Sequence, residues 1–378
     1  MIFPQALVLK LFVSIVFSIA LLSMFSCAHK PLGTGAKDNC SPVLRAAVDV
    51  GSGSTKLLIA QVDPCTQRIV EILLEDQRKL PYREELEACS SGEGLCLTGR
   101  VQERGWTLMS EWAQVFAEQG VEEVRGVATE ALRQARNGEE FITRLNREFP
   151  LQLKLIDQEQ EALLGFQAAV LGRQVRMDRG VSDLKKRVVW DIGGGSQQMS
   201  RWEGGGKWNV LKSDLGSVAF KNHVIQSIQG RNENRSPNPL SKNEVEKGIQ
   251  YARHRARDLA SPQWRRFLAR SSTEVLGVGG VHRFSLPGQL RQHPELNFSG
   301  DLYTAKQLAQ AIELRHGLRD EQIGGEYFET EITNLILVYA WMTEMGIRRV
   351  VPVPADLNLA LLSLSPKDWL KIRHISQD

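Results

Sequence analysis

The chain has 378 residues, a hydrophobic content of 42% and a formal net charge of +3. These values suffice for two domains of ordinary size and exclude a chain that needs metal or extra crosslinks in order to fold. The small net charge does not favour nucleic-acid binding, so we expect no nucleic-acid partner.

The first 26 residues are typical of an export signal. Their one charged side chain is Lys10, which precedes the apolar stretch Leu11–Phe25. This stretch is shorter than the roughly 20 residues of a spanning helix, and the cysteine that follows it suits lipoprotein processing. We predict a signal peptide over 1–26 and a lipid anchor at Cys27, with a periplasmic or cell-surface location. Simple secretion and an uncleaved membrane anchor are the alternatives.

Residues 27–42 are predicted to form a short tether between the lipid and the folded part, which begins near Val43. A first domain is predicted over 43–170 and a second over 171–378. The predicted strands of the first domain are Val43–Val48, Lys56–Val62, Arg68–Leu74, Val124–Ala128 and Leu153–Ile156. Its predicted helices are Gly105–Glu118, Glu130–Ala135 and Glu159–Val170.

Four further cysteines lie in a chain that we expect to be exported, where disulfides persist. If the first two strands pair antiparallel around a tight turn, Cys40 falls opposite Cys65, which predicts a bridge between them. Cys89 and Cys96 flank a turn-rich segment, and a second bridge would close it. Free thiols are the alternative. A zinc site is disfavoured, because no CxxC spacing or histidine pair accompanies these cysteines.

A three-strand pattern begins again at Val188, which marks the second domain. The predicted strands there are Val188–Ile192, Gln198–Trp202, Trp208–Lys212 and Glu274–Val278. Helical patterns dominate after Ser241.

One phrase occurs twice at the end of a strand, as Asp49–Ser54 and as Asp191–Ser196. Both copies predict a hairpin whose turn leaves backbone amides uncovered, so that phosphate oxygens can approach them. The aspartates Asp49 and Asp191 would then lie beside the anion, where they can hold a divalent cation or orient a water. The predicted phosphate contacts are Gly51, Ser52, Gly53, Ser54, Gly193, Gly194, Gly195 and Ser196. Two such loops, each in the same place after a strand, suggest a duplicated fold with a phosphate chain between its halves.

Further motifs occur in a defined order with these phrases, at 126–137, 156–162 and 215–218. Together they resemble the exopolyphosphatase and guanosine pentaphosphate phosphohydrolase family, within the superfamily of actin, hexokinase and the heat-shock ATPases. The resemblance covers Val43–Phe284 and implies an α/β fold. It implies two actin-like (ribonuclease H-like) domains, each with a mixed sheet flanked by helices, and an active site in the interdomain cleft.

The resemblance also assigns roles to particular residues. It implies that Glu161 is the catalytic base and that Arg133 contacts phosphate. It implies that Asp191 belongs to a magnesium or manganese shell or orients water, with Asp49 as a second metal residue. The glycines ending at Gly280 resemble the phosphate loop of the second domain in this family.

The chain departs from the family at two positions that bear on catalysis. Family members commonly have asparagine at the position of Gly53 and glutamate at the position of Gln198. A neutral amide at Gln198 weakens a site for a hard cation, which leaves Asp49 and Asp191 to hold it. The segment Ala355–Leu359 also lacks the glycine and arginine of the family.

We therefore predict a hydrolase that releases terminal phosphate from inorganic polyphosphate by attack of a base-activated water with a divalent metal. Polyphosphate and, through Cys27, a membrane are the expected partners, and a homodimer is left open. The alternatives are a catalytically weak lipoprotein that binds polyphosphate or another polyanion, and a phosphohydrolase of a pentaphosphate nucleotide. A P-loop is excluded, because Lys56 follows the hydroxyl residues of Gly51–Thr55 instead of preceding them.

Overall fold

The computed structural model describes residues 40–90, 92–179, 183–232 and 236–375. The predicted signal peptide and residues 27–39 of the tether lie outside these ranges, as does the predicted lipid anchor at Cys27. Within the described ranges, no helix combines the length and apolar character that a membrane span requires.

The first sheet is mixed and has five strands in the order β3-β2-β1-β6-β7. β1 is antiparallel to β2 and parallel to β6, and β6 is parallel to β7. These strands are β1 (Val43–Val50), β2 (Ser54–Val62), β3 (Ile69–Lys79), β6 (Glu123–Ala128) and β7 (Leu153–Leu155). The five predicted strands of the first domain are therefore confirmed, with shifted ends.

Helices α1 (Gly99–Gln119) and α3 (Gly138–Glu148) bury their apolar faces in one core with β1 and β2. α1 begins six residues before its predicted start, because the Thr98 side chain accepts a hydrogen bond from the Val101 amide and caps the helix there. α3 had no counterpart among the predicted elements. The remaining elements are α2 (Glu130–Gln134), α4 (Gln158–Val175) and the short pair β4 (Leu86–Ala88) and β5 (Leu95–Leu97).

The second sheet is also mixed, with the strand order β10-β9-β8-β11-β13-β12. Its strands are β8 (Arg187–Ile192), β9 (Gln197–Gly204), β10 (Lys207–Ser213), β11 (Glu274–Val278), β12 (Tyr303–Thr304) and β13 (Arg349–Pro352). β8 is antiparallel to β9 and parallel to β11, as β1 is to β2 and β6. The duplication inferred from the repeated phrase is therefore a duplication of sheet topology.

One long helix, α11 (Phe328–Met345), is central to the second core, where it packs with α6 and α9. Most of its residues are buried, as expected for a helix that is apolar around its circumference. The other helices of this half are α5 (Ser217–His223), α6 (Lys242–Leu259), α7 (Pro262–Leu268), α8 (Leu286–Arg291), α9 (Ala305–Arg315) and α10 (Asp320–Ile323). Helical turns at Leu184–Lys186, Val224–Ile228, Val281–Ser285 and Pro294–Leu296 complete it.

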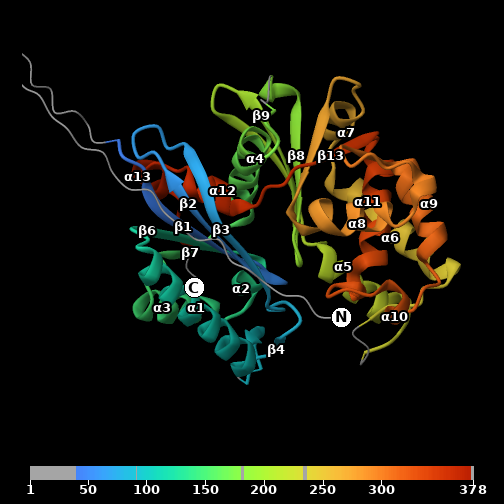
Figure 1. Cartoon of the computed structure of the whole chain (residues 1–378). Helices are drawn as coiled ribbons and strands as arrows, with labels where there is room; N and C mark the ends of the chain where they lie inside the picture. The colour runs from blue at the N-terminus through green and yellow to red at the C-terminus, as the bar shows by residue number, and fades with distance from the viewer. Residues whose placement is uncertain (1–39, 91, 180–182, 233–235, 376–378) are drawn as a thin grey trace, which may run out of the picture. The chain divides into compact units, whose positions relative to one another are not determined.

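The last helices of the chain return to the first sheet. α12 (Leu357–Leu362) and α13 (Pro366–Lys371), red in Figure 1, lie beside the blue strands β1 and β2. Arg125 of β6 donates hydrogen bonds to the carbonyls of Leu361 and Leu364, and Lys154 of β7 donates to two carbonyls at the end of α13. The predicted division at 170/171 assigns these helices to the second domain, although α12 packs against α4 and against β1, β2 and β6 of the first sheet.

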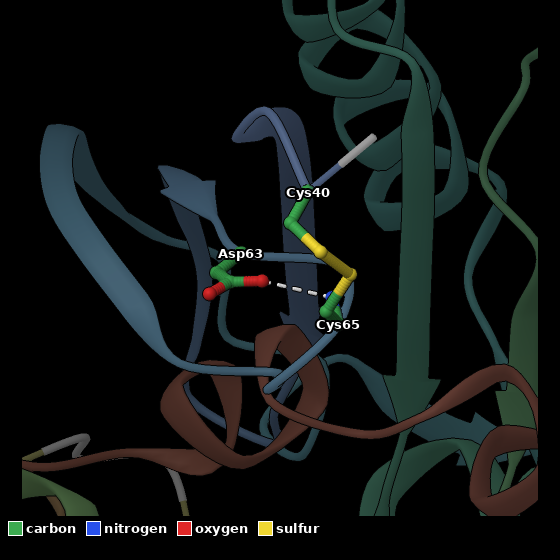
Figure 2. Close-up of side chains that lie close together, drawn as sticks. All are labelled: Cys40, Asp63 and Cys65. Carbon is green, nitrogen blue, oxygen red and sulfur yellow. Dashed lines mark hydrogen bonds between the residues drawn. A yellow bond between two sulfur atoms is a disulfide. The ribbon is translucent and has the colours of Figure 1, made fainter. Parts of the chain in front are cut away.

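The described residues contain two disulfides, and they are the two that the sequence predicts. Cys40 is joined to Cys65 with a Cα–Cα distance of 5.6 Å, and Cys89 is joined to Cys96. The first bridge follows from the ladder register, since Val43 pairs with Val62 and three more residues along each strand bring the cysteines opposite each other. In Figure 2, Asp63 lies beside this bridge and accepts a hydrogen bond from the Cys65 amide at 2.8 Å. Because both sulfurs are bonded to each other, this group offers no thiolate to a metal.

Candidate active site

The two repeated phrases form matching tight turns. The Gly51 amide donates to the Ser54 carbonyl at 3.1 Å, and the Gly193 amide donates to the Ser196 carbonyl at 2.9 Å. We call 51–54 the first loop and 193–196 the second loop. A Cβ on Gly194 would lie 3.1 Å from the Ser52 Cβ, so the tips of the two loops contact each other.

The aspartate before each loop faces a different partner. Asp49 pairs with Lys56 across the β1–β2 ladder, and Lys56 Nζ lies 3.1 Å from Asp49 Oδ2. Asp191 pairs with Gln198 across the β8–β9 ladder, and Gln198 Nε2 lies 3.4 Å from Asp191 Oδ2. The first half therefore places a cation beside its aspartate, while the second half places a neutral amide there.

The electrostatics of these groups follow from burial and mutual proximity. Burial, with added repulsion from Glu161 and Asp49, raises the pKa of Asp191 to about 7. Burial alone would lower the pKa of Lys56, but Asp49, Asp356 and Asp191 raise it above its ordinary value. Lys56 is therefore a permanent cation among carboxylates.

The predicted base and the predicted phosphate-binding arginine form an ion pair. Arg133 Nη1 lies 2.9 Å from Glu161 Oε2 and also donates to the Ile156 carbonyl at 2.7 Å. Glu161 follows the capping box of α4, in which Asp157 accepts a hydrogen bond from the Gln160 amide. Burial raises the pKa of Glu161 although Arg133 opposes this rise. A carboxylate with a raised pKa that is held by one arginine suits a proton acceptor.

All these carboxylates and both loops line one cavity of about 460 Å³. Carboxylates outnumber the lysines in its walls, and both lysines are paired, Lys56 with Asp49 and Lys79 with Glu329. The charged residues of the lining are Asp49, Lys56, Lys79, Glu84, Glu130, Glu161, Asp191, Glu326, Glu329, Glu331 and Asp356. An anionic substrate in such a cavity needs additional cations to balance its charge.

Carboxylates that could hold a divalent cation line this cavity. Asp191, Asp49 and Asp356 supply carboxylates, which magnesium and manganese prefer. Burial and repulsion from neighbouring carboxylates raise the pKa of Asp191 and of Asp356, and a bound cation would oppose both effects. Asp49 is already shared with Lys56, which leaves Asp191 as the more available ligand.

The other residues predicted for the site line the cavity, and some of them also stabilise the fold around it. The Ser52 hydroxyl donates to Glu130 Oε2 at 2.8 Å and accepts from the Ala131 amide at 3.1 Å, so it caps α2. Thr129, which precedes α2, makes no capping bond with its side chain. Gly280 lines the cavity, and its neighbour Gly279 has φ +84° and would place a Cβ 2.6 Å from Asp191 Oδ1. Gly279 is therefore the glycine that lets this loop approach Asp191.

Sequence reasoning missed three residues of the site. Lys56 could have been found from the hairpin register, because it faces Asp49. Glu130 lies in a motif that the sequence analysis used for Arg133 alone. Asp356 lies on the segment that crosses from β13 to α12, where its side chain is 9% exposed, and no sequence periodicity places it near Asp49.

Comparison with known proteins places this arrangement in a family. The model of the Ppx/GppA phosphatase family matches residues 58–278, more than half of the chain. The chain belongs to this family. The resemblance drawn from the motifs is therefore confirmed.

Curated relatives are similar over part of their length. A protein named guanosine-5'-triphosphate,3'-diphosphate pyrophosphatase from Vibrio atlanticus is 31% identical over 181 residues, which are 48% of this chain and 33% of the relative. A bifunctional 3-dehydroquinate synthase/phosphatase from Fusobacterium nucleatum is 26% identical over 181 residues, 46% of this chain and 25% of the relative. The chain thus spans about a third or less of these relatives.

Solved structures of the family share the fold. The Aquifex aeolicus member is 20% identical, with a TM-score of 0.64 over 88% of this chain and 100% of the other. An exopolyphosphatase from Cytophaga hutchinsonii is 15% identical, with the same TM-score and the same coverage. The predicted fold of two mixed sheets flanked by helices, in actin-like domains, is confirmed.

Proposed function

We propose that this protein is a phosphoanhydride hydrolase that releases the terminal phosphate of a polyphosphate chain. One observation carries the proposal: Glu161, which is paired with Arg133, lines the same cavity as two glycine turns and their aspartates. Hydrolysis of a phosphoanhydride needs an aligned water, a proton acceptor and stabilisation of spread negative charge, and these residues can supply all three.

In the proposed reaction, a water oxygen attacks the terminal phosphorus while the bond from that phosphorus to the bridging oxygen breaks. Glu161 accepts the proton of the water, and the shortened chain leaves with the bridging oxygen. The backbone amides of both loops and Lys56 stabilise the phosphate oxygens, and Arg133 holds Glu161 in position. A divalent ion held by Asp191 and Asp49 would neutralise charge on the phosphate chain.

Inorganic polyphosphate is the substrate that we propose first, and a nucleoside polyphosphate is the alternative. The predicted export of the chain favours the inorganic polymer, whereas the names of the Vibrio relatives point to a nucleotide. Because the cavity walls are acidic, we propose that either substrate enters as a complex with divalent cations.

The alternative to hydrolysis is that the protein is a lipoprotein that binds polyanions and does not turn them over. Gln198 supports it, since a neutral amide replaces a carboxylate that would strengthen the cation site. The retained Glu161–Arg133 pair opposes it, because a binder has little use for a buried proton acceptor.

The deciding experiment measures phosphate release by the purified mature protein from polyphosphate of defined length, with magnesium or manganese. Glu161→Gln is the matched control, since it keeps the shape of the side chain and removes the base. Release by the native protein that falls about 100-fold or more in the variant supports hydrolysis. Binding without release by either protein would support the polyanion-binding alternative instead.

Export and lipidation at Cys27 remain part of the proposal. Metabolic labelling with a fatty acid tests them, with Cys27→Ser as the control. Labelling that is equal in both proteins would contradict an anchor at this residue.

A further inference from the structure

Glu130 joins the two loops physically, and the reaction outlined above gives it no role. It is the first residue of α2 and is 5% exposed. Its Oε2 accepts the Ser52 hydroxyl of the first loop at 2.8 Å, and its Oε1 lies 2.6 Å from Arg83 Nη1. Its charge is therefore balanced by Arg83, and each of its oxygens has a partner within the first half.

The same carboxylate lies directly against the second loop. A Cβ built on Gly195 would come within 1.6 Å of Glu130 Oε2, a distance that no real structure tolerates. The second loop can therefore rest on Glu130 only because residue 195 is glycine. This contact, together with that of Gly194 with Ser52, limits how closely the second loop approaches the first.

Helix α2 carries this contact to the proposed base. Arg133 lies three residues after Glu130, on the same helical turn, and holds Glu161 at 2.9 Å. A helix of five residues has little internal freedom, so a shift at its Glu130 end moves the Arg133 end as well. The position of the base is thus linked to the spacing of the loops.

We propose that Glu130 is a positioning residue that helps to set the distance between the two phosphate loops. Through α2 it also positions the Arg133–Glu161 pair relative to these loops. The inference rests on the proposed function, because it assumes that both loops hold one phosphate chain. Misplacement of reacting groups by about 1 Å can cost about 100-fold in rate, so a spacer of this kind has a measurable effect.

The test first adds a Cβ at residue 195 and then removes the Glu130 carboxylate with which it would collide. Gly195→Ala should push the second loop away from Glu130 and lower kcat/KM about 100-fold, mainly through kcat. The double variant Gly195→Ala/Glu130→Ser removes the colliding carboxylate and should regain at least about tenfold over Gly195→Ala. Gly288→Ala is the matched control, since a Cβ there meets no atom within 4 Å; its activity should equal that of the native protein.

A second pair of variants covers the case in which Gly195→Ala does not fold. Glu130→Gln keeps the volume of the spacer and an acceptor for Ser52, whereas Glu130→Ala removes both. We expect Glu130→Gln to retain kcat within about threefold and Glu130→Ala to lose about tenfold, at melting temperatures that are recorded for each. A purely structural role would lower the melting temperature of Glu130→Ala and leave the kcat of the folded fraction unchanged.

Binding measurements separate failure of this inference from failure of the proposed function. The same substitutions are placed in a Glu161→Gln background, and their affinity for tripolyphosphate with manganese is measured by calorimetry. Absence of phosphate release by the native protein would contradict the hydrolase proposal but not the role of Glu130. Equal affinity in the presence and absence of Gly195→Ala, or no recovery in the double variant, would overturn the role of Glu130.

Discussion

Lys56 lies directly across the β1–β2 ladder from Asp49, with Nζ 3.1 Å from Asp49 Oδ2. The equivalent pair in the second half is Asp191 with Gln198. The duplicated hairpins therefore agree in backbone geometry and differ in charge. The difference places a lysine beside the aspartate of the first loop and a neutral amide beside the aspartate of the second.

Lys56→Met should remove the positive charge of this lysine. We expect kcat/KM for polyphosphate to fall about 100-fold, because a positive charge beside the phosphate chain is lost. The variant also leaves Asp49 buried without its partner, so the free energy of unfolding should fall by about 3 kcal/mol. Steady-state kinetics and urea unfolding measure the two effects. Lys56→Arg is the control, and equal losses in both variants would argue against a role for charge.

Gln198→Glu should strengthen the cation site. The new carboxylate would lie beside Asp191, where the amide now lies at 3.4 Å, and would add a hard oxygen ligand. We expect manganese to bind about tenfold more tightly in titration calorimetry. Unchanged affinity would mean that the cation does not sit between these two side chains.

The stability of the metal-free protein should depend on pH through Asp191. Burial and the neighbouring carboxylates raise its pKa from 3.8 to about 7. Between these values the folded protein binds more protons than the unfolded chain, so this group lowers stability as pH rises through about 7. The melting temperature should therefore fall between pH 5 and pH 8 in a chelating buffer.

Asp191→Asn should reduce that slope and leave the part due to Glu331, whose pKa burial also raises to about 7. Magnesium should reduce the slope in the native protein, since a bound cation favours the ionised carboxylate. A profile that keeps its slope in Asp191→Asn would assign the titration to another group.

Arg133→Met keeps Glu161 but removes its ion-pair partner, so it tests whether the base needs Arg133. Without its arginine, the buried carboxylate loses the largest influence that opposes burial and its pKa rises further, so kcat should fall about 100-fold at pH 7 and recover partly at pH 9. The pH–rate profile is the measurement. Arg136→Met is the matched control, because Arg136 pairs with the exposed Glu93 away from the cavity. A parallel loss in both variants would point to disturbed folding.

Cys40→Ser with Cys65→Ser should lower the free energy of unfolding by about 3 kcal/mol, since the bridge closes a loop with a sequence separation of 25. Kinetic constants should stay unchanged, because this bridge lies away from the cavity lining. Thermal melting and phosphate release measure the two effects. A loss of activity in the folded double variant would contradict this separation.

Much of the fold could be predicted because its signals are local. The two hairpins, the register that joins Cys40 to Cys65, and the strand Glu274–Val278 all follow from short runs of sequence. The limits of prediction lie in long-range contacts. No pattern near Asp356 indicates that it enters the cavity, and nothing in the sequence of α12 shows that it packs on β1 and α4.

The candidate site was predictable to a similar extent. Glu161, Asp49 and Asp191 were identified from motifs and line one cavity, whereas Arg133, identified in the same way, is absent from its lining and pairs with Glu161. The role of Glu130 became visible only through its distance from Gly195, which depends on how the two halves meet. Side chains whose partners lie on a distant segment are the ones that sequence patterns miss.

The return of α12 and α13 to the first sheet has a consequence for the order of folding. Buried residues of β1 and β2, among them Ala47 and Leu58, share a core with Leu359 and Leu361 of α12. During synthesis these strands emerge long before the helix that covers them, so their apolar face stays unprotected until the end of the chain arrives. The first sheet, although made first, is thus among the last parts to be completed, and the protein needs protection from aggregation until then.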